Sequence, residues 1–146
     1  MGACEIEQAE MYFKKLMKIT LVFAAAWNTL IFAITPVVLS FYVLEEKTKR
    51  LTILLVLIHN VCNAIAFPFA DPLGKGLRAA GDVKFTMIIS LVTTIVIRLV
   101  FSVFFGIILN MGVIGIALAM CLDWIIRGGI FILRQRSGKW KKFRVI

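Results

Sequence analysis

Long stretches without a charged side chain limit what this chain can fold into. Residues 19–44 and 51–70 contain no Asp, Glu, Lys or Arg over 26 and 20 residues. An α-helix rises about 1.5 Å per residue, so about 20 apolar residues cross a hydrocarbon core of about 30 Å. Both stretches are long enough to cross a membrane. The sequence therefore predicts an all-α integral membrane protein.

Two further apolar stretches follow in the second half of the chain. Residues 85–109 are interrupted only by Arg98, and residues 113–133 only by Asp123 and Arg127. A tight turn of Asn110, Met111 and Gly112 separates them. The sequence predicts a single domain, a bundle of four transmembrane helices spanning about 19–44, 51–70, 85–109 and 113–133.

Basic residues predict the orientation of these spans. The chain has 17 Lys and Arg against 8 Asp and Glu, a net charge of +9. Twelve of the 17 lie in an amphipathic lead-in (1–18), the segment 71–84 and a basic tail (134–146), and three lie between the first two spans. Positive residues concentrate on the cytosolic side, so we expect a multi-pass plasma-membrane protein with both termini in the cytosol. Because the charges flank apolar stretches, their expected partner is the lipid bilayer and not nucleic acid.

The segment ADPLGKGLRAAGDVK, residues 70–84, is the longest polar interruption. We expect a capped loop between the second and third spans. Gly81 suits the left-handed position after a helix end. Asp82 suits the N-cap of the next helix, where its carboxylate accepts from free backbone N–H groups. Arg78 and Asp82 are expected to anchor this loop in the cytosol.

Charged residues within the last two spans predict a network. Arg98 and Asp123 are nearly equidistant from Met111, so an antiparallel hairpin places them at similar depth. Arg127 is one turn from Asp123 on the same helix face. An unpaired charge at this depth is costly, so we predict an Arg98–Asp123–Arg127 network. It acts either as a structural clamp on the hairpin or as a coupling element.

Polar residues in the first two spans are candidates for a substrate or cation pathway. These are Asn28, His59, Asn60 and Asn63, because polar groups in lipid usually face the bundle interior. His59 has two interpretations: a proton relay, or a neutral imidazole bonded to an Asn or a backbone carbonyl. Catalytic and metal sites are not expected. The sequence has no nucleophile–base pair, no phosphate loop and no Cys/His cluster, so we do not expect an enzyme.

Several separated segments resemble the C-terminal part of multidrug and toxic compound extrusion (MATE) transporters. They are LRAAGDVKF, the following span with Arg98, NMGVIGIALAM, DWIIRGGIF and RSGKW. The opening GACEIEQAE resembles the cytosolic loop before the ninth helix of that family. The resemblance covers essentially the whole chain. It implies that the four spans form helices nine to twelve of a two-lobed, twelve-helix antiporter, and so belong to its C-terminal lobe.

The resemblance also implies an activity. Family members export organic, often cationic, amphiphiles and couple this to Na⁺ or H⁺, with no other cofactor expected. The implied partners are organic cations or amphiphilic drugs, if the chain is part of a complete transporter, and the missing N-terminal helices. Family carboxylates lie in those missing parts, and the first two spans here carry none. We therefore expect a fragment that cannot transport alone, with Met1 either an internal methionine or the start of a truncated product.

Two other functions remain open. One is a non-transporting membrane remnant or interaction subunit. The other is a self-sufficient, dimeric four-helix multidrug exporter. Such exporters rely on an acidic residue in their first span, and residues 19–44 contain none, which counts against this alternative.

Overall fold

The computed structural model describes residues 6–142, and every regular element in that range is helical. The predicted all-α class is therefore confirmed. The helices are α1 (Ile6–Ser40), α2 (Glu46–Ile65), α3 (Phe67–Ala70), α4 (Pro72–Ala79), α5 (Val83–Val92), the π-helix η1 (Thr93–Leu99), α6 (Val100–Val103), the π-helix η2 (Phe104–Ile108), α7 (Val113–Arg136) and the 3₁₀-helix η3 (Lys139–Lys142).

The helices supply enough apolar length for four membrane crossings. Glu7–Ser40, Val83–Ile108 and Val113–Arg136 are each long and apolar enough to span a bilayer. Glu46–Ile65 and Phe67–Ala79 provide a fourth crossing if they count as one span, bent by 53°. The protein is thus a membrane helical bundle.

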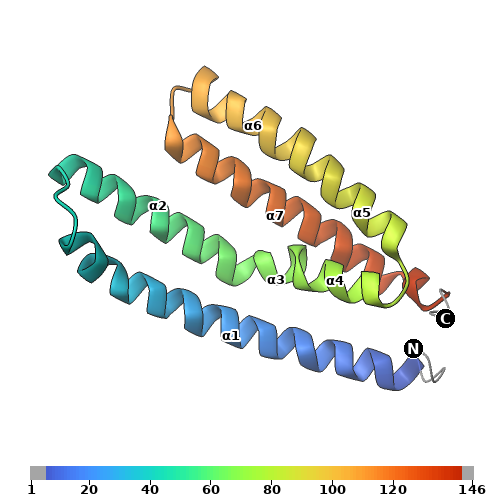
Figure 1. Ribbon diagram of the computed structural model, residues 1–146. Coiled ribbons are helices and arrows are strands. Elements are labelled where there is room, and N and C mark those ends of the chain that lie inside the picture. Colours follow the sequence, from blue (N-terminus) through green and yellow to red (C-terminus); the bar gives the residue numbers. More distant parts are fainter. Residues whose placement is uncertain (1–5, 143–146) are drawn as a thin grey trace.

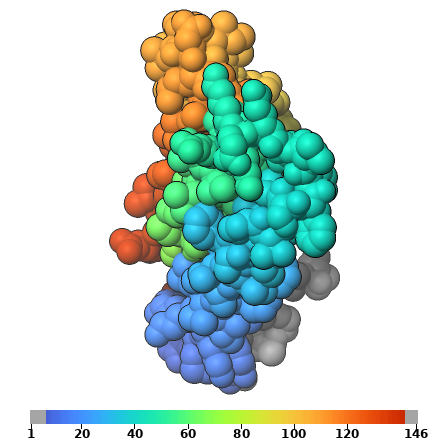
Figure 2. All heavy atoms as spheres, turned by 90° about the vertical axis from the view of Figure 1, so that its left-hand side faces the viewer, coloured from blue at the N-terminus to red at the C-terminus, as the bar shows by residue number. Residues whose placement is uncertain are grey.

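The crossings lie side by side in a row. In Figure 1, α1 neighbours α2, the α2–α4 segment neighbours α7, and α7 neighbours the α5–α6 segment. Figure 2 shows the same order from the end where α1 joins α2: blue and teal α1 and α2 below, orange α6 and α7 above. Because the helices lie in a row, the apolar side chains on the outer faces of its two outer helices are exposed. Val22 and Phe23 of α1 and Leu91 of α5 are each more than 60% exposed.

A buried core lies at the end of the row that holds Glu10 and Trp140. Leu73, Leu77 and Phe131 are fully buried there and pack with Trp140. Phe13 of α1 stacks on Trp140 with ring centroids 6.0 Å apart. Gly74 allows Phe131 this close approach, since a methyl group at Gly74 would lie 2.6 Å from Cε2 of Phe131.

This core explains a correction to the predicted loop. Residues 72–79 form helix α4, and Arg78 lies in that helix and not in a loop. Pro72 begins the helix, where its missing N–H costs nothing. Two glycines and a proline lower the helix propensity of this segment, but burial of Leu73 and Leu77 offsets that cost. The expected left-handed conformation of Gly81 is confirmed, with φ of 96°.

Other boundaries also differ from the prediction. The lead-in and the first span form one continuous helix that ends at Ser40, four residues before the predicted end at 44. The second helix begins at Glu46 and is interrupted at Ala66, just before Phe67-Pro68. Residues 1–5 and 143–146 of the predicted lead-in and tail lie outside the described residues.

Candidate functional site

Amide side chains join the C-terminal half of α1 to the last turn of α2. Asn28 is 7% exposed, and its Nδ2 donates to the carbonyl oxygen of Ala24 at 2.7 Å and to Oδ1 of Asn63 at 3.1 Å. A hydrogen bond between helices within lipid is worth about 0.6–2 kcal/mol. The Asn28–Asn63 bond therefore fixes the register of α1 on α2.

A groove lies beside this bond. It has a volume of about 220 Å³ and is lined by Ala25, Asn28, Thr29, Phe32, Leu57, Asn60, Val61 and Ala64. Asn60 is 7% exposed, and its Nδ2 has no hydrogen-bond partner. An apolar groove with the amide side chains of Asn28 and Asn60 in its wall can hold a largely apolar ligand that carries a polar group.

His59 lies away from the groove. Its ring packs edge-on against Trp124 of α7, with centroids 5.4 Å apart and planes at 66°. Phe67 packs on Trp124 in the same way, at 5.4 Å. The structure thus places Asn28 and Asn60 in the wall of the groove, joins Asn63 to Asn28 by a hydrogen bond, and places His59 outside the lining.

A second polar group connects the α5–α6 segment to α7. Arg98 Nη2 and Arg127 Nη2 both donate to Oδ2 of Asp123, at 2.8 and 2.9 Å. Asp123 is fully buried, whereas the side chains of Arg127 and Arg98 are 13% and 34% exposed. Arg98 belongs to η1, and π-helical turns often occur at functional positions.

The network carries more positive than negative charge. Two guanidinium groups share one carboxylate oxygen, and the other oxygen, Oδ1, is buried without a partner. Nε of Arg98 and of Arg127 are also buried and unpaired. Burying ions in this way is costly and makes each partner depend on the others. The predicted Arg98–Asp123–Arg127 contacts are present, and they connect η1 to α7.

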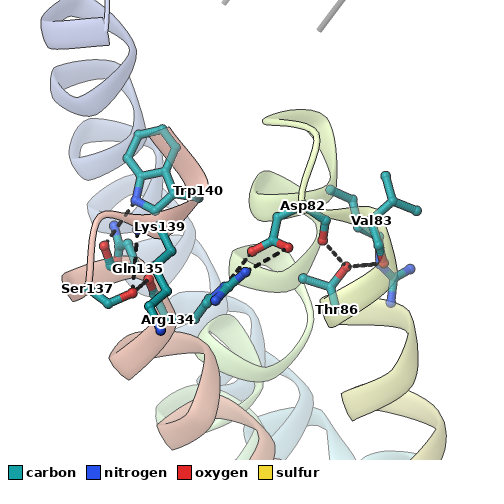
Figure 3. Close-up of polar contacts among 9 residues, drawn as sticks. Asp82, Val83, Thr86, Arg134, Gln135, Ser137, Lys139 and Trp140 are labelled. Atoms are coloured by element: carbon teal, nitrogen blue, oxygen red, sulfur yellow. Dashed lines mark hydrogen bonds and ion pairs between the residues drawn. The ribbon is translucent and has the colours of Figure 1, made fainter. Parts of the chain in front are cut away.

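A third polar group lies where α4 turns into α5, at the end of the row near Trp140. Arg134 of α7 donates from Nε to Oδ2 of Asp82 at 2.7 Å and from Nη2 to Oδ1 at 3.2 Å (Figure 3). The N-cap role predicted for the Asp82 carboxylate is therefore wrong. The residue occupies the N-cap position of α5 without a side-chain cap bond, because its carboxylate forms a bidentate pair with Arg134.

Thr86 connects the same turn to Arg78. It is fully buried and donates its hydroxyl to the carbonyl oxygen of Asp82 at 2.9 Å. Arg78 donates from Nε to Thr86 Oγ1 at 3.2 Å and from Nη2 to Ser90 Oγ at 3.1 Å. Arg78, Gly81 and Asp82 thus position α4, α5 and α7 relative to one another, and they do not surround a pocket.

Comparison with known families agrees with this architecture. The family model described as MatE matches residues 1–104. The chain belongs to the MatE family. The family predicted from the sequence is thereby confirmed, and its members are membrane efflux transporters and not enzymes in the usual sense. No solved structure matches the chain.

Within this MatE chain, sequence reasoning missed the Asp82–Arg134 pair. The positions of the two residues in the predicted hairpin already indicated that they lie close together. A hairpin that places residue 98 opposite residue 123 also brings the start of the third span near the basic end of the fourth. The position of Asp82 before a helix predicted backbone N–H groups as its partners. A bidentate arginine is the stronger partner for a carboxylate.

Proposed function

We propose that the chain forms four helices of the C-terminal half of a MATE-type antiporter that exports organic cations or amphiphilic drugs in exchange for Na⁺ or H⁺. The observation that carries this proposal is the family match over residues 1–104. The row of helices is compatible with it, because lipid or further helices can cover the exposed apolar faces of its outer helices. The membrane is the plasma membrane, with both termini cytosolic.

The groove on α1 and α2 is the proposed substrate-facing part. Its lining is mostly apolar, which suits an amphiphile, and the amide of Asn60, whose Nδ2 is buried and unpaired, is proposed to turn toward an acceptor on the substrate. Asn28 and Asn63 position this wall through their mutual bond.

The coupling carboxylate is proposed to come from outside this chain. Asp123 is the only Asp or Glu between Val83 and Arg136, and two arginines already occupy it. Two guanidinium groups beside this carboxylate oppose the approach of a further cation. The chain alone is therefore expected to lack transport.

Efflux from membrane vesicles tests this proposal. Ethidium release driven by an imposed Na⁺ or H⁺ gradient is measured for the 146-residue chain and for the longest in-phase reading frame found by sequencing the DNA upstream. We expect release only from the longer product. Robust gradient-driven release by the 146-residue chain would overturn the need for additional helices. A DNA sequence that encodes no further helices, together with inactive vesicles, would favour a non-transporting membrane component.

Asn60→Leu in the longer product tests the groove itself. We expect about a tenfold loss of ethidium transport, the effect of one hydrogen bond worth about 1.4 kcal/mol. Thr52→Val on the same helix is the matched control, because Thr52 bonds only to its own helix at the carbonyl oxygen of Thr48. Equal transport by the two variants would exclude Asn60 from the substrate path.

A further inference from the structure

A second groove lies between the start of α5 and the end of α7. It has a volume of about 260 Å³ and is lined by Phe85, Ile130, Leu133, Arg134, Ser137 and Lys139. Its wall has an apolar part and a polar part. Phe85, Ile130 and Leu133 are apolar, and the other three residues carry N–H or O–H groups. The groove lies at the ends of two crossings, where lipid headgroups meet the hydrocarbon.

Arg134 is held rigidly at this groove. Asp82 binds its Nε and Nη2 (Figure 3). The guanidinium carbon of Arg134 lies 4.4 Å from the centre of the Phe85 ring. The cation–π contact and the bidentate pair together fix the guanidinium plane. Nη1 is left as a donor in a fixed position.

Lys139 supplies a charge that no neighbour neutralises. It is exposed, and within residues 6–142 no carboxylate lies within 4.0 Å of its ammonium group. Asp82 neutralises Arg134, so Lys139 gives the groove a net positive charge. Ser137 connects the two: its hydroxyl donates to the carbonyl oxygen of Arg134 at 2.7 Å and lies 3.5 Å from the backbone N–H of Lys139.

We propose that this groove binds an anionic phospholipid. Its phosphate contacts Lys139 and Nη1 of Arg134, and the first part of an acyl chain lies on Phe85, Ile130 and Leu133. Basic pockets between helices at the membrane surface recognise anionic headgroups in this way. The apolar wall favours a lipid over free phosphate, because free phosphate gains nothing from apolar contact. The site is independent of the transport proposal, since it involves none of the residues of the α1–α2 groove.

Native mass spectrometry of the purified chain in detergent micelles tests the site. Phosphatidylglycerol and phosphatidylcholine with the same acyl chains are titrated separately. We expect phosphatidylglycerol to bind more tightly, and Lys139→Gln to weaken its binding about fivefold and that of phosphatidylcholine by less, because the choline cation offsets the charge of its phosphate. Lys139 is exposed, so this variant should fold, which circular dichroism checks. Lys47→Gln at the opposite end of the row is the matched control and should have no effect.

Two further arms separate the lipid from other phosphate sources. Inorganic phosphate and chain-free glycerophosphoglycerol should not displace bound phosphatidylglycerol at matched concentrations. Leu133→Ala removes three carbons from the apolar wall and should weaken phosphatidylglycerol binding at least about fourfold, the effect of a single buried methylene. Displacement by inorganic phosphate would overturn the lipid assignment in favour of a phosphate site. Equal binding of the two lipids, or equal effects of Lys47→Gln and Lys139→Gln, would overturn the site altogether.

Discussion

At the residue scale, the most consequential side chain is Asp123. It is fully buried, and one of its oxygens accepts from both Arg98 and Arg127. Its depth opposite Arg98 could be predicted by counting residues on each side of the turn at Met111. The absence of a partner for Oδ1 of Asp123 and for Nε of the two arginines could not be predicted, because it depends on side-chain rotamers that a residue count does not determine.

Replacement of Asp123 by Asn tests the clamp. The change leaves two arginines with no opposing charge, and breaking a buried pair in this way costs about 3–5 kcal/mol. We therefore expect the free energy of unfolding of the purified protein in mixed micelles to fall by that amount, measured by denaturant titration and circular dichroism.

Two comparisons make the Asp123 result specific. Glu10→Gln removes a half-buried carboxylate that pairs with Lys14 and Lys141, and it should destabilise the protein far less than Asp123→Asn. Adding Arg98→Gln to Asp123→Asn should cost less than the sum of the two single changes. Additive losses, or an Asp123→Asn loss as small as that of Glu10→Gln, would show that the network does not hold the hairpin.

At the element scale, the third crossing and α7 approach closely at their shared turn. Gly115 of α7 lies against the backbone of η2, where an added methyl group would be 2.6 Å from the carbonyl carbon of Phe105 and 2.7 Å from the Gly106 nitrogen. Backbone cannot move aside as a flexible side chain can. The spacing of small residues in the sequence is typical of such packing, but it cannot predict which glycine touches backbone.

Gly115→Ala should therefore destabilise the hairpin by about 1–3 kcal/mol, the usual cost of overpacking. Gly129→Ala on the same helix is the control, because a methyl group there meets nothing within 4 Å and alanine favours a helix by about 1 kcal/mol. Thermal unfolding in detergent should lower the midpoint for the first variant and leave it unchanged or raised for the second. Equal midpoints would mean that α7 and η2 are not in backbone contact.

Helix α4 could not be predicted from the local sequence alone. Prolines and glycines between Pro68 and Gly81 indicate a turn, and the bend between α2 and α4 is real. The helix itself depends on Phe131, which lies more than 50 residues further along the chain and packs against Gly74. Local propensity carries no information about such a partner. For the same reason, the sequence placed Asp82 at a helix start but could not show its pairing with Arg134.

At the scale of the whole molecule, the row places its two ends in different chemical surroundings. One end holds Glu10, Lys75, Arg134 and Lys141, and both described chain ends meet there through the Glu10–Lys141 ion pair. The opposite end holds the α1–α2 connection with Lys47, Lys49 and Arg50. The proposed orientation places the first end in the cytosol, because positive residues there outnumber those at the other end.

Thiol labelling in intact cells tests that orientation. Lys75→Cys and Lys47→Cys are placed separately in a chain whose native cysteines are changed to serine, and both positions are exposed. A membrane-impermeant maleimide should label the Lys47→Cys protein in intact cells, whereas the Lys75→Cys protein should be labelled only after the membrane is opened. The cysteine-free chain is the control for background labelling. The reverse pattern would show that the basic end lies outside the cell. Labelling of both positions in intact cells would mean that the segments between them do not cross the bilayer.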